Sequence, residues 1–531
     1  MSFVWWKHGV LYQIYPRSFC DSTGNGTGDL DGIRQKLDHL EKLGVSGIWL
    51  SPCFVSPMND FGYDVADYKN IDPLFGDNAA LERLLDDVHA RGMKLLLDFV
   101  PNHTSDQHPW FQSALQGKDA PFRDFYVFKD PAPDGGPPNN WKSIFGGSAW
   151  KLDENSGQYF LHSYLDSQPD LDWRNPKVEE AMHDVVRFWF DKGVDGFRID
   201  VIHRVAKDPL WRDNPVEVTA ASYNGQTRVH DENHEDVHTF VRRLRAVVDN
   251  YDERALVGEI FLFSPETVAA YYGQGDELHL AFNFAFTRAR YTADSFADEI
   301  RKLNDAVPDE GWPCWVLSNH DLVRHKTRYA HPTRPELDDD RARMLAMLLL
   351  FLPGTPFVYN GDEIGMRQQR IPDDKRQDPI WQTLAADESR DGCRTPMLWT
   401  AEAPGFGFTS ADEAWLPLVD DGERTRSVEE QDADAGSMLQ LYRDVIAMRQ
   451  KHEVLTQARR LAIDVDGDVL TLRRTLDDGT TATGVFHFGD DAVDWPASLP
   501  TADQAVARSR NSDGMLGAAS AFWFVAKPLK P

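Results

Sequence analysis

The chain has 531 residues, of which 41% are hydrophobic and 27% are charged, and its formal net charge is −29. A length of this order predicts two or three domains, unless one of them is a large barrel. The acidic charge argues against nucleic acid and anionic membranes as partners, because both bind basic surfaces. A neutral substrate is compatible with this composition.

The N-terminal residues and the cysteines give expectations about location. No basic segment followed by an apolar stretch and a cleavage site opens the chain, so a signal peptide is not expected. The longest apolar run, residues 344–352, is too short to span a bilayer. Four cysteines lack the spacing of a metal site, which favours free thiols in a reducing cytoplasm: Cys20, Cys53, Cys314 and Cys393.

Short apolar strand patterns alternate with helical patterns along most of the chain. Helices are predicted at residues 31–44, 81–92 and 175–193, the last with Asn175 as N-cap. Strands are predicted at residues 11–16, 47–52, 93–100, 193–203, 255–260, 280–284, 314–320 and 355–360. Eight strands alternating with helices predict an α/β fold, the (β/α)₈ barrel. A doubly wound sheet is the alternative, but no glycine-rich phosphate loop follows the first strand.

Two segments interrupt this alternation. Residues 101–174 are rich in Pro, Gly, Asn and Trp and are predicted to form an inserted subdomain after the third strand, over the barrel mouth. From residue 453 onward, short alternating strands with Asp-Gly turns predict a C-terminal antiparallel β-sandwich over 453–531. The barrel would then comprise residues 1–100 and 175–452.

Polar side chains gather where four of the predicted strands end, and barrels of this class carry their active sites there. A single Asp or His in such a place is usually structural, and Asp98 alone is interpreted in this way, while His203 has no assigned role. Four strand ends together favour a catalytic site. The residues concerned are Asp98, Asn102, His103, Arg198, Asp200, His203, Glu259, Asn319, His320 and Asp321.

Carboxylates beside an arginine suit glycoside hydrolysis, which needs one ionised nucleophile and one protonated acid. Arg198 and Asp200 share one face of a strand, so Arg198 is expected to lower the pKa of Asp200. Glu259 has no cation near it in the sequence and is the better acid. No G-x-S-x-G elbow, P-loop or HExxH motif is present. The alternating residues of the same strand are expected to face the helices: Phe197, Ile199 and Val201.

Four motifs occur in the order and on the strands of the α-amylase superfamily, glycoside hydrolase family 13. DFVPNH, GFRIDVIH, VGEI and SNHD resemble its four conserved regions. QPDLDW (168–173) resembles an extra motif of the oligo-1,6-glucosidase-like branch, and the segments WWKHGVLYQIYPRSF and FGYDVADY match as well. Over essentially its whole length the chain is similar to the α-glucosidase and oligo-1,6-glucosidase branch of this family.

The resemblance implies a retaining, exo-acting α-glucosidase that acts on short oligosaccharides. Asp200 would be the nucleophile, Glu259 the acid and base, and Asp321 the residue that holds the sugar hydroxyls. Asp64 and Arg394 would pair and grip the non-reducing end. The other implied pocket residues are Arg198, His103, His320, Tyr63, Phe145, Tyr164 and Gln168. A retaining mechanism predicts about 5–5.5 Å between the carboxyl groups of Asp200 and Glu259.

The residue after the nucleophile bears on linkage. In this branch Val tends to accompany activity on α-1,6 links, and Thr or Ala activity on α-1,4 links, so Val201 favours isomaltose-type substrates. Hydrolases of trehalose, and isomerases of sucrose or maltose, share the same catalytic set, and transglucosylation remains open. A non-catalytic transporter subunit would carry a membrane segment and lack the carboxylates. Oligomeric state is not predicted.

The loop DSTGNGTGDLDG (21–32) predicts a structural ion far from the chemistry. Its oxygen-bearing side chains stand at alternate positions, which suits Ca²⁺ or Mg²⁺, and relatives in this branch often hold calcium here. Thr23 and Asn25 reduce its charge, so a glycine-rich turn without an ion is the alternative. No cofactor is expected for the reaction itself. The predicted ligands are Asp21, Thr23, Asn25, Thr27 and Asp29.

Overall fold

The computed structural model describes residues 3–216, 225–380, 389–402, 405–418, 421–497, 499–510 and 514–528. Eight parallel strands lie side by side in the order β11-β10-β9-β5-β2-β1-β13-β12, and a bridge between Phe282 and Cys314 joins the two outer strands. The (β/α)₈ barrel is therefore confirmed. Its strands are β1 (Leu11–Ile14), β2 (Gly47–Leu50), β5 (Lys94–Phe99), β9 (Gly196–Ile199), β10 (Ala255–Gly258), β11 (Leu280–Ala281), β12 (Cys314–Val316) and β13 (Thr355–Tyr359).

Helices cover the outside of the barrel, and most of them bury one apolar face; α11 (Asp338–Phe351) differs, because every residue from Met344 to Phe351 is buried. The predicted helix over 31–44 is two helices, α2 (Leu30–Gln35) and α3 (Leu37–Leu43), because Lys36 leaves the helical region at ψ 7°. Helix α6 (Pro176–Asp191) begins as predicted, with the Asn175 side chain accepting from the N–H of Lys177. The others are α4 (Asn78–Ala90), α7 (Val237–Val248), α8 (Pro265–Ala270), α9 (Ala293–Ala306) and α14 (Met438–Lys451).

The barrel interior is filled below the mouth. Trp49, Leu96 and Val257 pack there with the rings of Phe282 and Phe357. Such a packed interior excludes a pore and leaves the loops at the carboxyl ends of the strands as the place where a substrate can bind.

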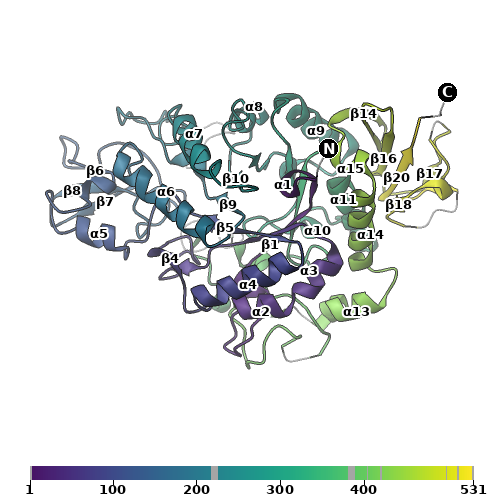
Figure 1. Cartoon of the computed structure of the whole chain (residues 1–531), viewed down its shortest axis with the longest axis horizontal. Helices are drawn as coiled ribbons and strands as arrows, with labels where there is room; N and C mark the ends of the chain where they lie inside the picture. The colour runs from purple at the N-terminus through teal and green to yellow at the C-terminus, as the bar shows by residue number, and fades with distance from the viewer. Residues whose placement is uncertain are drawn as a thin grey trace.

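The segment between β5 and α6 forms a small unit of its own. It contains α5 (Pro109–Ala114) and an antiparallel sheet of β6 (Phe128–Lys129), β8 (Gln158–Leu161) and β7 (Trp150–Asp153). Figure 1 shows this unit at one end of the molecule, with the C-terminal sheet at the opposite end. The inserted subdomain therefore leaves the barrel directly after its third strand.

The C-terminal part is an antiparallel sheet in the order β14-β15-β16-β20-β18, with a two-stranded sheet beside it. Leu516 of the smaller sheet packs on Val485 and Phe522 of the larger one, which gives the expected sandwich a short second layer. The strands are β14 (Arg460–Asp466), β15 (Val469–Thr475), β16 (Thr481–His487), β17 (Val493–Asp494), β18 (Ala507–Arg508), β19 (Met515–Leu516) and β20 (Ser520–Ala526).

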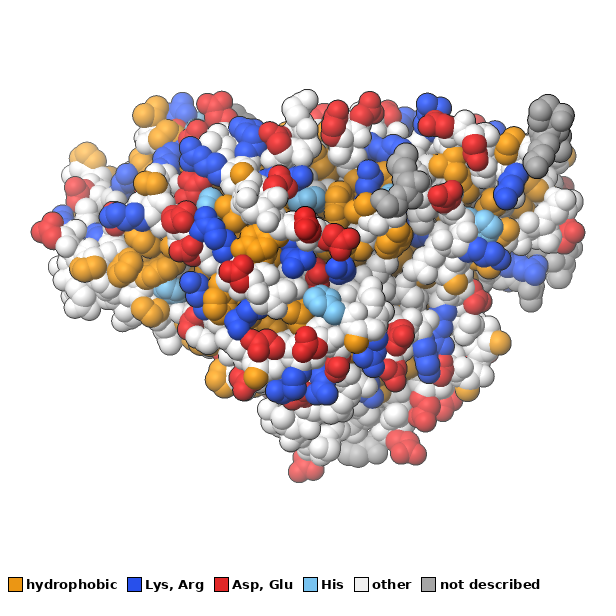
Figure 2. Space-filling view, in the orientation of Figure 1, with side chains coloured by type: hydrophobic (Ala, Val, Ile, Leu, Met, Phe, Trp, Pro, Cys, Tyr) orange, Lys and Arg blue, Asp and Glu red, His pale blue; other side chains and the backbone are white. Residues whose placement is uncertain are grey.

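The surface charges, the helices and the cysteines bear on possible partners and location. Figure 2 shows acidic and basic side chains interspersed over the face in view, without a broad basic patch. Within the described ranges, no helix has the length and apolar character needed to cross a bilayer. The four cysteines are free and buried.

Candidate active site

One buried guanidinium organises the barrel mouth. Arg198 Nη1 lies 2.8 Å from Asp200 Oδ1 and 3.0 Å from Asp98 Oδ1, and its Nη2 lies 2.8 Å from Glu259 Oε2. These carboxylates belong to the neighbouring strands β5, β9 and β10 or follow them directly. The charges in β9 are therefore paired, which is the condition for burying them.

The charge balance of this cluster differs from the prediction. Burial raises the pKa of Asp200 well above its usual range, the Glu259 and Asp98 charges add to the rise, and Arg198 opposes it. Burial likewise raises the pKa of Asp98 to about 7. Arg198 acts to lower the pKa of Asp200 as expected, but burial outweighs it, so the expectation of a low pKa for Asp200 is wrong. Glu259 has no cation near it in the sequence, but the fold brings Arg198 Nη2 to 2.8 Å from its Oε2.

The nucleophile and acid predicted from the sequence lie together. Asp200 and Glu259 are within hydrogen-bond reach of each other, and this contact is one cause of the raised pKa of Asp200. Inverting enzymes hold their carboxyl groups about 6.5–9.5 Å apart to admit a water, so direct contact favours a retaining site. The predicted spacing of about 5–5.5 Å between the carboxyl groups of Asp200 and Glu259 stays a prediction.

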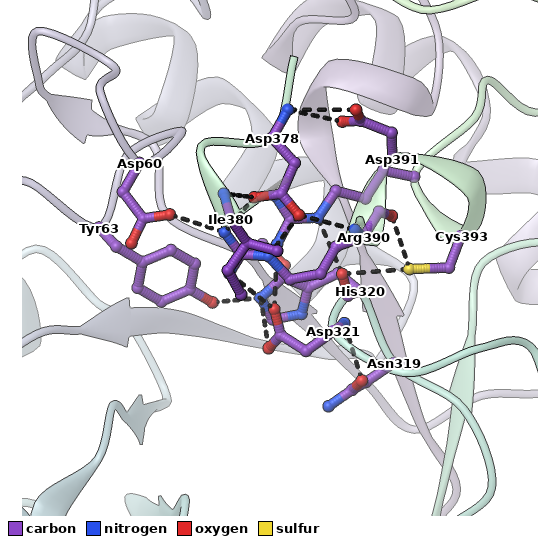
Figure 3. Close-up of polar contacts among 12 residues, drawn as sticks. Asp60, Tyr63, Asn319, His320, Asp321, Asp378, Ile380, Arg390, Asp391 and Cys393 are labelled. Carbon is purple, nitrogen blue, oxygen red and sulfur yellow. Dashed lines mark hydrogen bonds and ion pairs between the residues drawn. The ribbon is translucent and has the colours of Figure 1, made fainter. Parts of the chain in front are cut away.

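Asp321, the third predicted catalytic residue, is held in its ionised form. Burial acts to raise its pKa, but the neighbouring His320, Arg390 and Arg394 outweigh burial and hold the pKa below its usual range. Its Oδ1 lies 3.0 Å from Arg394 Nη2 and 3.3 Å from Arg390 Nη1. Figure 3 shows this carboxylate beside His320. An ionised group here can accept hydroxyl hydrogen bonds and stabilise positive charge on a sugar ring.

The predicted pair of Asp64 and Arg394 is wrong, and a neighbouring pair takes its place. Asp64 accepts from Ser56 Oγ and from the N–H groups of Asn59 and Asp60. Arg394 pairs instead with Asp321.

Arg390 lies 3.0 Å from Asp60 and 2.7 Å from Asp378, as Figure 3 shows. Asp64 therefore shapes the loop that presents Asp60, and the Asp60–Arg390 pair faces Asp321. Asp60, Arg390 and Asp378 were missed from the sequence; the first two stand four residues before the predicted Asp64 and Arg394.

The other predicted pocket residues converge on the same place. Burial lowers the pKa of His103 to about 4, so its ring is neutral at pH 7. Gln168 Nε2 lies 3.2 Å from both His103 Nε2 and Asp60 Oδ2. The Tyr63 ring stacks on His320 with centroids 5.5 Å apart, and the two side chains share a 2.6 Å hydrogen bond.

Two aromatic rings lie beside this cluster of residues. The Tyr164 ring centroid lies 5.2 Å from that of His103 and 5.9 Å from that of Phe145. The Arg390 guanidinium carbon lies 5.7 Å from the centroid of the Phe145 ring. The cluster thus combines hydroxyl-binding groups with aromatic faces, which is what recognition of a sugar ring requires.

Replacing Asp60 is expected to harm activity more than replacing Asp64. Asp60→Asn removes the charge opposite Arg390 and should lower kcat/KM for disaccharides about 10- to 100-fold. Asp64→Asn alters only the hydrogen bonds within the loop, so we expect mainly a lower Tm, with a smaller change in kcat/KM. Kinetics and thermal unfolding of both variants provide the check. A larger kcat/KM loss for Asp64→Asn would restore the original pairing.

In the loop predicted to hold an ion, residues 21–32, the carboxylates of Asp21 and Asp29 accept hydrogen bonds from the protein. Asp21 accepts from the N–H groups of Thr23, Gly24 and Gly26 and from the Thr409 hydroxyl. Asp29 accepts from the N–H groups of Ser22 and Gly32. This pattern favours a loop closed without an ion, and the metal prediction remains untested.

The Tm is accordingly expected to be the same in a chelator and in millimolar calcium. An ion that binds only the folded state would raise the Tm with its concentration. Differential scanning fluorimetry in EDTA, calcium and magnesium measures this directly. A calcium-dependent rise that is lost in an Asp21→Ala variant would contradict the expectation and restore the predicted site.

The comparisons with known proteins agree with this geometry. Residues 13–458 match the family model described as alpha amylase, catalytic domain. The chain belongs to the α-amylase family. Among family members, the "Probable alpha-glucosidase" of Rhizobium meliloti is 41% identical over 485 residues, which cover 89% of this chain and 87% of that protein.

Two further family members are similar over nearly the whole chain. The "Oligo-1,6-glucosidase" of Heyndrickxia coagulans is 39% identical over 493 residues, covering 86% of this chain and 87% of the other. The crystal structure of the alpha-glucosyl transfer enzyme XgtA superposes with a TM-score of 0.92 at 39% identity, and covers 99% of this chain and 100% of that chain. The recognised family and its α-glucosidase branch are thus confirmed.

Proposed function

We propose that this family member is a retaining, exo-acting α-glucosidase that releases terminal glucose from short oligosaccharides. The observation that carries the proposal is the Arg198 fork, which holds Asp200 and Glu259 against each other at the barrel mouth. Asp321, Asp60 and Arg390 line the same pocket and supply its hydroxyl-binding groups.

Each catalytic carboxyl group has one oxygen that accepts from protein donors, so its other oxygen is the one that reacts. Arg198 binds Asp200 Oδ1, and both Arg198 and the Val201 N–H bind Glu259 Oε2. Asp200 Oδ2 then attacks the anomeric carbon, while Glu259 Oε1 gives its proton to the glycosidic oxygen. The carbon–oxygen bond of the substrate breaks and a glucosyl ester with Asp200 forms. Glu259 next takes a proton from water, whose oxygen attacks the anomeric carbon, and the ester bond breaks to release α-glucose.

The proton balance of the cluster supports this sequence. The raised pKa values of Asp98 and Asp200 keep a proton within the cluster at neutral pH. The attacking Asp200 must be ionised, which becomes easier once its neighbour holds the shared proton. Asp321, whose pKa is lowered, stays negative beside the oxocarbenium-like sugar.

Linkage is proposed as α-1,6 in preference to α-1,4, in keeping with Val201. We expect kcat/KM for isomaltose to exceed that for maltose. A Val201→Thr variant should shift this ratio towards maltose. Glucose release from both sugars measures the ratio, and a preference for maltose in the unmodified protein would contradict the proposed linkage.

A neutral substrate fits the mouth better than a phosphorylated one. The buried cation Arg204 is paired with Glu232. Lys207 is likewise paired with Asp170 at 2.6 Å. A phosphate would have to compete with these carboxylates for both cations, and the net charge of −29 adds repulsion. Trehalose and sucrose therefore remain better alternatives than their phosphate esters.

Transfer of glucose to a second molecule is supported by a different observation. Phe261 and Phe263 follow Glu259 closely in the chain, and their rings are 40% and 37% exposed. The Arg288 guanidinium stacks on Phe263 at 3.4 Å. Because these exposed aromatic residues stand two and four positions after the acid, we propose that they stack on a leaving or accepting sugar and that transglucosylation is a secondary activity. The buried free cysteines support the proposed cytoplasmic location.

A further inference from the structure

Val201, directly after the predicted nucleophile, has an unusual backbone conformation. Its φ is 34° and its ψ is 44°, which is the left-handed region. Of the non-glycine residues that the structure describes with positive φ, Val201 alone is β-branched. Such a residue is a genuine outlier there, because its branched side chain crowds the backbone. The strand predicted over 193–203 accordingly ends at Ile199, and Val201 is not one of its helix-facing residues.

Ordered structure on both sides holds this turn in place. The N–H of Asp200 donates to Phe99 O at 2.8 Å, and the N–H of Arg204 donates to Val201 O at 2.8 Å. The side chain of Val201 is buried, with 6% of its surface exposed. Two residues, Asp200 and Val201, thus connect β9 to the following short helix, Ile202–Arg204. Strained residues of this kind persist where the surroundings over-determine them, and they cluster at functional sites.

The left-handed turn at Val201 directs its backbone N–H toward the catalytic acid. The N–H of Val201 donates to Glu259 Oε2 at 3.1 Å, and Arg198 Nη2 lies 2.8 Å from the same oxygen. Two donors on one carboxyl oxygen favour negative charge on it and disfavour a proton there. The acidic proton of Glu259 is thereby directed to Oε1.

We propose that Val201 is a positioning residue whose left-handed turn points its N–H at Glu259 Oε2 and so presents the proton of Glu259 on Oε1 to the leaving oxygen. This inference rests on the glucosidase reaction proposed above and goes beyond it by assigning the proton to one oxygen. It also gives the strain at Val201 a function that is separate from the effect of its side chain on linkage.

The direct test deletes the N–H and keeps the side chain. Nonsense suppression with the α-hydroxy acid of valine converts the amide at residue 201 into an ester. The matched control places the same hydroxy acid at Val205, whose N–H donates to Ile202 O at 3.3 Å and touches no carboxylate. Both proteins are assayed with isomaltose, which needs a protonated leaving group, and with 4-nitrophenyl α-glucoside, which needs far less proton transfer.

The ester at residue 201 is expected to lower kcat/KM for isomaltose about 10-fold or more, the value of a hydrogen bond to a charged group. The nitrophenyl substrate should lose much less. Loss of a donor to this carboxyl group should also move the alkaline limb of the kcat/KM profile to higher pH. The ester at residue 205 should alter neither the substrate ratio nor that limb.

Equal losses for both substrates with an unmoved alkaline limb would overturn the proposal and leave Val201 a structural turn. Should the ester fold poorly, the α-hydroxy acid of alanine at residue 201 deletes the same N–H with less crowding at positive φ, and Val201→Ala, which has the same side chain and keeps the N–H, is its matched control. The alanine ester should lower the isomaltose rate relative to the nitrophenyl rate in the same direction, and an unchanged ratio counts against the proposal. Absence of glucose release by the unmodified protein would reject the glucosidase itself.

Discussion

Asp200→Asn is expected to reduce glucose release from isomaltose and maltose by about 10⁴-fold or more. The amide cannot attack the anomeric carbon, so the covalent route is lost, while Glu259 and Asp321 remain in place. The side chains have nearly the same size, and the amide oxygen can still accept from Arg198, so the fold should survive. Initial rates together with circular dichroism provide the measurement.

The matched control for this variant is Asp184→Asn, the same change on the exposed face of α6, which leaves all three catalytic carboxylates intact. It should retain far more activity than Asp200→Asn. If Asp200→Asn kept more than about a tenth of the activity in a correctly folded protein, Asp200 would not be the nucleophile. Added azide should partly restore a variant that has lost its nucleophile, with inversion of the product.

Removing Arg198 is expected to be the most damaging change to both stability and activity. Arg198→Met leaves Asp98, Asp200 and Glu259 buried without their shared cation, and breaking a buried ion pair typically costs about 3–5 kcal/mol of unfolding free energy at neutral pH. Activity should fall about 10³-fold or more, because neither the charge nor the orientation of the reacting carboxyls is maintained.

The pH dependence of this loss has a definite sign. The pKa of Asp98 is raised to about 7, so the folded protein keeps a proton that the unfolded chain releases near pH 4. The stability from this carboxyl is fully present below about pH 4 and is lost as the pH rises through about 7. Without Arg198 the carboxyl pKa values rise further, and the loss between pH 5 and pH 8 grows.

Urea unfolding at pH 5 and pH 8 measures this difference. Arg198→Lys is the control: it keeps one positive charge and should recover part of the stability, but it lacks the fork that reaches three carboxylates and should stay nearly inactive. An Arg198→Met variant with the same pH dependence as the unmodified protein would contradict the charge balance described for the cluster.

Much of this fold and site could be predicted from the sequence for a simple reason. Buried parallel strands are apolar runs, and their polar ends mark the barrel mouth, so Asp200, Glu259 and Asp321 stand out on three strands. The contacts that join these carboxylates could not be predicted in the same way. Asp98 lies opposite Arg198 in the β5–β9 register, and that register exists only once the barrel closes.

Loop conformation limited the prediction elsewhere. Asp60 and Asp64 are both acids in one short loop, and which of them meets an arginine depends on how the loop turns. Met58 and Phe61 have φ values of 65° and 51° there, and bulky residues give no sequence signal for a left-handed conformation. The turn at Val201 was missed for the same physical reason, and its apolar side chain read as more strand.

The central claim is that Asp200 and Glu259 carry out a retaining hydrolysis of α-glucosides. It is tested most directly by following the anomeric proton of released glucose by NMR, with 4-nitrophenyl α-glucoside as the substrate because it yields a single glucose. We expect α-glucose to appear first and the β-anomer to follow only through mutarotation. Initial β-glucose would show an inverting enzyme and contradict the assignment of Asp200 as a nucleophile.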